Sequence, residues 1–180
     1  MGNIETVKNI IATNIEVDWI NDVTGGSDTE MIKIIASSNY SVVIMHNLGV
    51  PANPAITVPD NENVTQIVMS WLKEKIKLCE CYGVEKSKII IDPGIGFGKT
   101  AHQSLQIIKN IENFKELGCQ ILVGHSRKSF FNLFTDKPYS ERDIETYVTS
   151  VFLASKNVDY LRVHDVEGNI RALEVAKGVF

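Results

Sequence analysis

Short apolar runs alternate with longer amphipathic stretches along the chain. The runs are rich in Val, Ile and Leu and are nearly continuous rather than alternating with polar residues. Such runs are typical of strands that are buried on both faces of a parallel sheet. We predict five strands, over Val17–Asn21, Ser41–Met45, Lys88–Asp92, Gln120–Gly124 and Asp159–Val163.

The stretches between these runs have helical spacing. The clearest spans Glu62–Tyr82, where apolar residues such as Val64, Val68 and Trp71 recur on one face and Gly83 stands at the expected end. Because helices and strands alternate, the sequence predicts one α/β domain over residues 1–180, with parallel strands joined by right-handed crossovers. The other helices are expected over Ile4–Ala12, Glu30–Ala36, Ser104–Leu117, Glu141–Ser155 and Asn169–Lys177.

The composition narrows the class of protein. Hydrophobic residues make up 44% and charged residues 22%, as in ordinary globular proteins. The net charge is −4 and no basic block occurs, which argues against a nucleic-acid surface. No apolar run has the length of a membrane span, and the N-terminus does not resemble a signal peptide. The three cysteines form no disulfide pattern, so we expect reduced thiols and a cytoplasmic protein.

Every predicted strand ends in a cluster of polar residues. The carboxyl ends of parallel strands lie at one edge of a sheet, so the five clusters are expected to meet there and form a site. The cations among them suit an anionic substrate and are Lys99, Arg127, Lys128, Arg162 and His164. The four histidines lack metal-ligand spacing, which argues against a zinc site.

The glycine-rich segment from Asp92 to Lys99 matches neither common nucleotide motif. Only three residues separate Gly94 from Gly98, whereas a P-loop has four. The same glycines, with Gly96 between them, close one residue too early for a dinucleotide fingerprint. A sharp turn after a strand explains the glycines, but it explains neither the carboxylate nor the lysine.

Five segments together resemble the dihydropteroate synthase family. They are INDVTGG, VVIMHN, IDPGIGFGKT, GHSRKSF and RVHDV, in this order along the chain. Members of that family use a TIM barrel in folate biosynthesis. They join 6-hydroxymethyl-7,8-dihydropterin pyrophosphate to p-aminobenzoate, which gives 7,8-dihydropteroate and pyrophosphate. The resemblance implies a partial (β/α)8 barrel, Mg²⁺ bound with the substrate pyrophosphate, and a homodimer.

The resemblance also implies roles for the pterin-facing residues. Asp92 would accept hydrogen bonds from the amino group and ring N–H of the pterin, a donor edge that a carboxylate matches. Asn21 would pair with the same ring, and Met45 would pack on its face. Lys128 would donate to the pterin carbonyl or to a ring nitrogen.

The remaining roles concern the pyrophosphate and p-aminobenzoate. Arg162 and His164 would hold the pyrophosphate, because residues i and i+2 of a strand share a face. Lys128, Arg162 and His164 would then act catalytically, by positioning the substrate and stabilising the departing anion. Ser126 resembles the residue that contacts the p-aminobenzoate carboxylate. Phe97 and Lys99 belong to the loop that lines the aromatic ring, and Arg127 belongs to the positive cluster.

The family barrel has eight strands, whereas this sequence predicts five. By resemblance the chain begins within the third helix, so the strand with the Mg²⁺-contacting Asn is missing and no metal ligand is expected here. The edge strands Val17–Asn21 and Asp159–Val163 would lie open. The chain would be half of a split enzyme completed by a second polypeptide, a gene remnant or a chosen fragment.

The sequence thus favours a synthase that is active once the missing strands are supplied. A non-catalytic, vestigial pterin-binding fragment is the main alternative. A pterin-dependent methyltransferase is less favoured, because it has no pyrophosphate to bind and would not need the cations of Ser126–Phe130 and Arg162–His164.

Overall fold

The computed structural model describes residues 4–13, 15–51, 53 and 55–180 of the chain. Its centre is a five-stranded parallel sheet with the strand order β1-β2-β3-β4-β5. The five predicted strands are confirmed, although four are shorter than expected. The strands are β1 (Trp19–Asp22), β2 (Ser41–Met45), β3 (Ile89–Asp92), β4 (Gln120–Val123) and β5 (Tyr160–Leu161).

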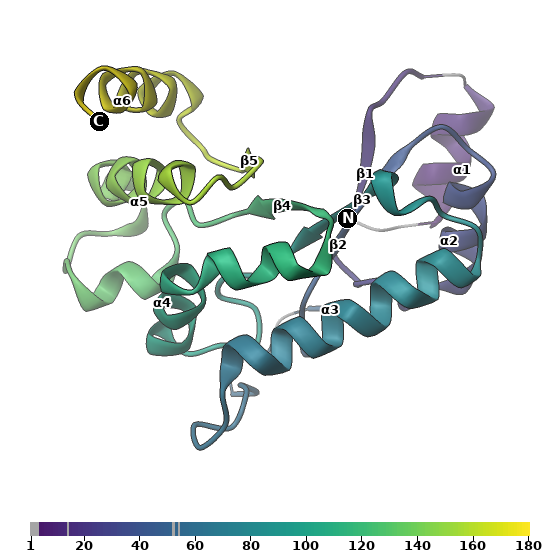
Figure 1. Ribbon diagram of the computed structural model, residues 1–180, viewed down its shortest axis with the longest axis horizontal. Helices are drawn as coiled ribbons and strands as arrows, with labels where there is room; N and C mark the ends of the chain where they lie inside the picture. The colour runs from purple at the N-terminus through teal and green to yellow at the C-terminus, as the bar shows by residue number, and fades with distance from the viewer. Residues whose placement is uncertain (1–3, 14, 52, 54) are drawn as a thin grey trace.

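The helices follow one another around one side of the sheet, from α1 and α2 at one end to α5 and α6 at the other (Figure 1). Consecutive strands are joined through helices, as the alternating pattern predicted. Among the described residues, no helix combines the length and the apolar character needed to cross a membrane. The helices are α1 (Ile4–Ala12), α2 (Thr29–Ala36), α3 (Val64–Cys81), α4 (Ala101–Lys109), α5 (Asp143–Ser155) and α6 (Val166–Val179).

Two predicted helices differ from the structure by three residues or more at an end, and the others agree to within two residues. The helix expected over Ser104–Leu117 starts at Ala101, because the side chains of Thr100 and Gln103 form a reciprocal capping box. It ends as an α-helix at Lys109 and continues as a 3-10 helix over 111–117. The last helix starts at Val166 rather than Asn169, because the Asp165 side chain accepts the Gly168 N–H and caps it.

The two faces of the sheet carry cores of different size. The face toward the helices contributes residues such as Ile44, Ile91 and Ile121 to the large hydrophobic core. The opposite, inner face carries a small cluster of Val43, Ile90 and Leu122, against which Tyr160 packs. The rings of Trp19 in β1 and Tyr160 in β5 lie 4.7 Å apart between centroids. Side chains from the first and last strands therefore meet across the inner face, so the sheet is strongly curved.

Candidate functional site

The carboxyl ends of the strands bring Asn21, Met45 and Asp92 together on the inner face. Side chains alternate along a strand, and the pairs Asn21↔Val43 and Met45↔Asp92 are in register, so all three share the face of Val43. Met45 and Asp92 are fully buried. Within the described part of the chain, the buried Oδ1 of Asn21 has no hydrogen-bond partner. Such an atom is costly unless a ligand supplies a donor.

Asp92 is the central acid of this site. Its Oδ2 accepts a hydrogen bond of 2.9 Å from Nη2 of Arg162, and its Oδ1 accepts one of 2.8 Å from the N–H of Gly94. Burial raises the pKa of the Asp92 carboxyl, whereas the Arg162 charge and the Gly94 N–H oppose that rise. The structure thus joins the residue expected to read the pterin to the residue expected to hold the pyrophosphate.

Lys99 points into the protein rather than toward the open end of the site. Its Nζ lies 2.9 Å from the carbonyl oxygens of Gly94 and Phe97 and 2.8 Å from Nδ1 of His46. Three acceptors therefore match the three hydrogens of an ammonium group. Burial lowers the pKa of Lys99 to about 7, with Asp92 opposing the shift. The amine braces the loop between β3 and α4, because the glycine-rich turn folds back over it.

His46 supports the same loop and received no role from the sequence. Burial, and secondly the Lys99 charge, lower the pKa of His46 to about 3, so the ring is neutral and Nδ1 can accept from the lysine. The ring also packs edge-on against Trp71, with centroids 5.0 Å apart. The loop after β3 packs closely against the backbone of His46, since a Cβ on Gly94 would lie 2.0 Å from the His46 carbonyl oxygen. Its place directly after Met45 was the signal that could have marked this histidine.

The side chains of Lys128 and Phe97 are in contact. The Lys128 Nζ lies 4.6 Å from the centre of the Phe97 ring, within the range of a cation–π contact. Burial lowers the pKa of Lys128, the Arg162 charge lowers it further, and Asp92 opposes both. Lys128 therefore shares the electrostatic environment of Arg162 and Asp92, as expected for one site.

Ser126 is in contact with His164. Its Oγ lies 2.9 Å from His164 Nδ1 and accepts a 3.2 Å hydrogen bond from the His164 backbone N–H. Ser126 is buried and His164 is exposed. With Nδ1 facing the serine, Nε2 is the ring nitrogen left to meet a ligand.

Arg127 differs from the other predicted site residues. Its backbone is left-handed, with φ of 56°, and its side chain turns to α5. There Nε and Nη2 each donate a 2.8 Å hydrogen bond to the Asp143 carboxylate. This bidentate pair raises the pKa of Arg127. Arg127 is thus bound to the helix that follows the loop, and not to the group around Asp92.

Comparison with known proteins decides the family. The family described as "Pterin binding enzyme" matches residues 4–164 of this chain. The chain belongs to the pterin-binding enzyme family. The predicted resemblance is confirmed, because the relatives and solved structures that match the chain include dihydropteroate synthases.

Relatives within the pterin-binding family are longer than this chain. It is 42% identical over 160 residues to a folate synthesis bifunctional protein of Chlamydia caviae, covering 89% of this chain and 36% of the relative. It is 40% identical over 181 residues to a dihydropteroate synthase of Clostridium beijerinckii, covering 96% of this chain and 63% of the relative. The chain therefore spans about a third of the first and under two thirds of the second.

Solved structures of the family confirm the fold. The chain matches the dihydropteroate synthase of Anaplasma phagocytophilum, crystallised with bound 6-hydroxymethylpterin-monophosphate, with a TM-score of 0.91 and 38% identity over 99% of this chain and 69% of that one. It matches the Thermus thermophilus enzyme in complex with 4-aminobenzoate with a TM-score of 0.90 and 27% identity, over 100% and 69%. The expected partial barrel of five parallel strands is thus confirmed.

Proposed function

We propose that this chain is the pterin-binding part of a dihydropteroate synthase. It would condense 6-hydroxymethyl-7,8-dihydropterin pyrophosphate with p-aminobenzoate to give 7,8-dihydropteroate and pyrophosphate. The observation that carries the proposal is the buried Asp92 carboxylate, which is bound to Arg162 and shares one face of the sheet with the unpaired Asn21 oxygen. Buried acceptors on one face of the sheet, with a partly exposed cation bound to one of them, match a ligand with a donor-rich ring edge and an anionic tail. The bound ligands of the two solved relatives support this choice.

The proposed reaction uses positioning and charge. The donor edge of the pterin pairs with Asp92 and Asn21, and Met45 lies under the ring. The neutral aniline nitrogen attacks the pterin methylene carbon, a C–N bond forms as the C–O bond to pyrophosphate breaks, and the nitrogen releases a proton to solvent. Arg162 and the Nε2 of His164 hold the departing anion, because charge develops there in the transition state.

We also propose Mg²⁺ as the cofactor, bound with the pyrophosphate, where it would neutralise charge on the phosphate oxygens. Over residues 4–13, 15–51, 53 and 55–180, no three His, Cys, Asp or Glu side chains are grouped as a metal site. The ligands of the ion would therefore be mainly substrate oxygens, and we assign no step to a protein-bound metal.

The open inner face supports a second proposal: the first three strands of the barrel come from a segment other than these 180 residues, such as a second polypeptide. Trp19 is still 36% exposed although its ring faces inward. A cavity of about 300 Å³ adjoins it, and inward-facing residues of the missing strands would fill that space. The cavity is lined by Asp18, Trp19, Ser41, Ile90, Gln120 and Tyr160.

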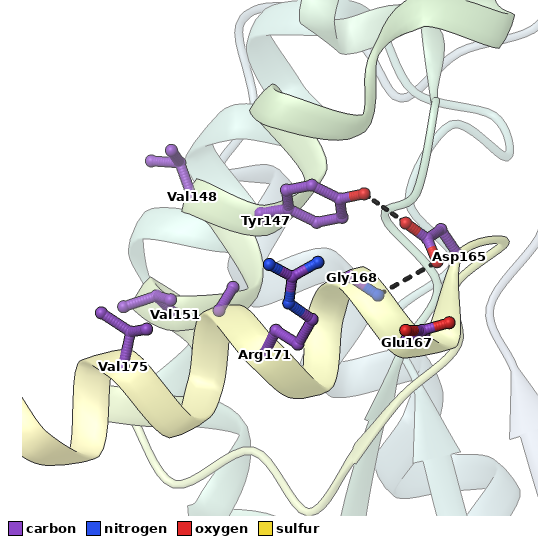
Figure 2. A pocket seen from close by; sticks show the side chains of 9 residues that line it. Tyr147, Val148, Val151, Asp165, Glu167, Gly168, Arg171 and Val175 are labelled. Atoms are coloured by element: carbon purple, nitrogen blue, oxygen red, sulfur yellow. Dashed lines mark hydrogen bonds between the residues drawn. The ribbon is translucent and has the colours of Figure 1, made fainter.

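We propose that the completed protein is a homodimer that uses the outer face of α5 and α6. A groove of about 760 Å³ lies between these helices (Figure 2). One end is polar, where the Tyr147 hydroxyl donates to Asp165. Val148 and Val175, at the other end, are 67% and 66% exposed. Exposed apolar surface of this extent is typical of protein contacts.

We also propose a cytoplasmic location for the protein. It is supported by the free cysteines, of which Cys79 is buried.

The proposed function is tested by complementation. The 180-residue chain is purified alone and together with a polypeptide that spans the first three strands of the Clostridium beijerinckii relative. Condensation is then assayed with both substrates. We expect little product from the chain alone, because the wall beside the pterin is open to water and the hydrogen bonds to Asp92 and Asn21 are weakened by solvent. The mixture is expected to turn over.

Each outcome of this assay is informative. Ordinary turnover by a monomeric chain alone would show that five strands suffice. Binding of the pterin pyrophosphate without condensation in the mixture would favour the non-catalytic pterin-binding alternative. Failure to bind the pterin pyrophosphate in either preparation would refute the proposed function.

A further inference from the structure

The contact between Arg162 and Asp92 spans three strands. Asp92 ends β3, Arg162 follows β5, and β4 lies between these strands in the sheet. Neighbouring strands are about 4.8 Å apart, so the two backbones are separated by roughly 10 Å. The guanidinium nevertheless lies 2.9 Å from the Asp92 carboxylate. The arginine side chain must therefore pass over β4.

Gly124 lies where the arginine crosses β4. A Cβ at this position would lie 2.4 Å from Nη2, 2.9 Å from Cζ and 3.0 Å from Nε of Arg162, and these are its three nearest atoms. Its φ is not in the positive region, unlike that of Gly94 or Gly96. The backbone at Gly124 therefore accepts any residue, and only the space requires glycine.

The next residue cannot block this path. His125 is fully buried, and its Nε2 lies 2.8 Å from the Ser150 Oγ of α5. Its side chain is thus turned toward the helices, on the other side of the sheet from Arg162. A Cβ on Gly124, by contrast, would lie directly against the guanidinium.

We infer that Gly124 is a positioning residue: its missing side chain lets Arg162 cross β4 and pair with Asp92. The pterin-reading carboxylate and the anion-binding cation then form one unit. The ligand roles in this inference rest on the proposed function, whereas the placement of the arginine does not. With a side chain at position 124, the guanidinium would move toward solvent, because the arginine side chain is already 40% exposed.

The experiment compares Gly124→Ala, Arg162→Ala and the double variant. Gly178→Ala is the matched control, because a Cβ on Gly178 meets nothing within 4 Å. The first readout needs no ligand: the Asp92 carboxyl is titrated by carbon NMR, and Asp92→Asn assigns its signal. We expect Gly124→Ala to raise the pKa of Asp92 as Arg162→Ala does, with no further rise in the double variant.

The second readout is calorimetry in the complemented assembly, with the pterin pyrophosphate and the plain pterin alcohol. Loss of one charge-assisted contact is expected to weaken the pyrophosphorylated ligand about ten- to a hundred-fold in Gly124→Ala, and the alcohol less. The double variant is expected to bind no more weakly than Arg162→Ala, because the alanine then has nothing to displace.

The outcomes separate this inference from the proposed function. An additional loss from Gly124→Ala in the Arg162→Ala background, or an unchanged Asp92 titration, would overturn the inference. If the wild type does not bind the pterin pyrophosphate, the proposed function fails and the ligand-free titration still decides the placement. If Gly124→Ala does not fold, folding of the double variant supports the clash with Arg162, and failure of both contradicts it.

Discussion

Replacing Asp92 by asparagine is expected to separate ligand affinity from stability. The change keeps the shape of the side chain but removes its charge and turns one acceptor into a donor. In the wild type the two carboxylate oxygens accept from Gly94 and Arg162. An asparagine can keep one of these hydrogen bonds, and its NH₂ group then opposes the other donor. The same NH₂ group would also face a hydrogen-bond donor on the edge of the pterin, where the carboxylate of the wild type would accept.

The expected loss of pterin affinity is larger than the expected change in stability. A hydrogen bond to a charged group contributes about 1.5–3 kcal/mol, so pterin affinity is expected to fall roughly ten- to a hundred-fold. Stability changes less, because two contributions oppose each other. The wild type bears the desolvation cost of a fully buried carboxylate, about several kcal/mol, which asparagine removes. The partly exposed Arg162 loses a contact of about 1.5–3 kcal/mol but can be hydrated instead.

Calorimetry with a pterin analogue and urea unfolding measure the two quantities in the same preparation. Asp159→Asn is the matched control, because that carboxylate accepts the Ile121 N–H at 2.8 Å, at the opposite end of the sheet. We expect the control to bind the pterin normally. Unchanged affinity in a folded Asp92→Asn variant would remove Asp92 from the site and refute the reasoning.

Two further predictions concern the cations. Arg162→Ala is expected to weaken the pyrophosphorylated pterin about ten- to a hundred-fold and the plain alcohol much less, and equal losses in calorimetry would show that Arg162 reads the ring or is structural. For Lys99, burial lowers the folded-state pKa from 10.5 to about 7. Between these values the unfolded chain binds more protons, so the unfolding free energy is expected to rise with pH, by up to about 1.4 kcal/mol per unit relative to Lys99→Met. Urea unfolding at a series of pH values measures this difference, with Lys73→Met, at an exposed position, as the control. If the unfolding free energies of the wild type and of Lys99→Met change in parallel with pH, this account is contradicted.

Local patterns in the sequence determined the elements and the edge at which the site lies. Continuous apolar runs such as Ser41–Met45 and Lys88–Asp92 identified buried parallel strands, because each strand must bury both faces. The polar residues that follow each run then had to meet at one edge of the sheet. Asn21, Met45 and Asp92 do so, because alternation and register place them on the same face.

Only the tertiary structure decided which polar groups meet. Arg162 pairs with a residue 70 positions away, and Lys99 with one 53 positions away. The first pair forms where the Arg162 side chain crosses β4 at Gly124, and the second forms because the loop after β3 folds over His46. Neither arrangement is a property of a local sequence pattern. Arg127 turns to α5 instead, although its sequence neighbour Lys128 faces the site. A strand-end pattern determines where the backbone of a charged residue lies, and the packing of distant strands determines which group its side chain contacts.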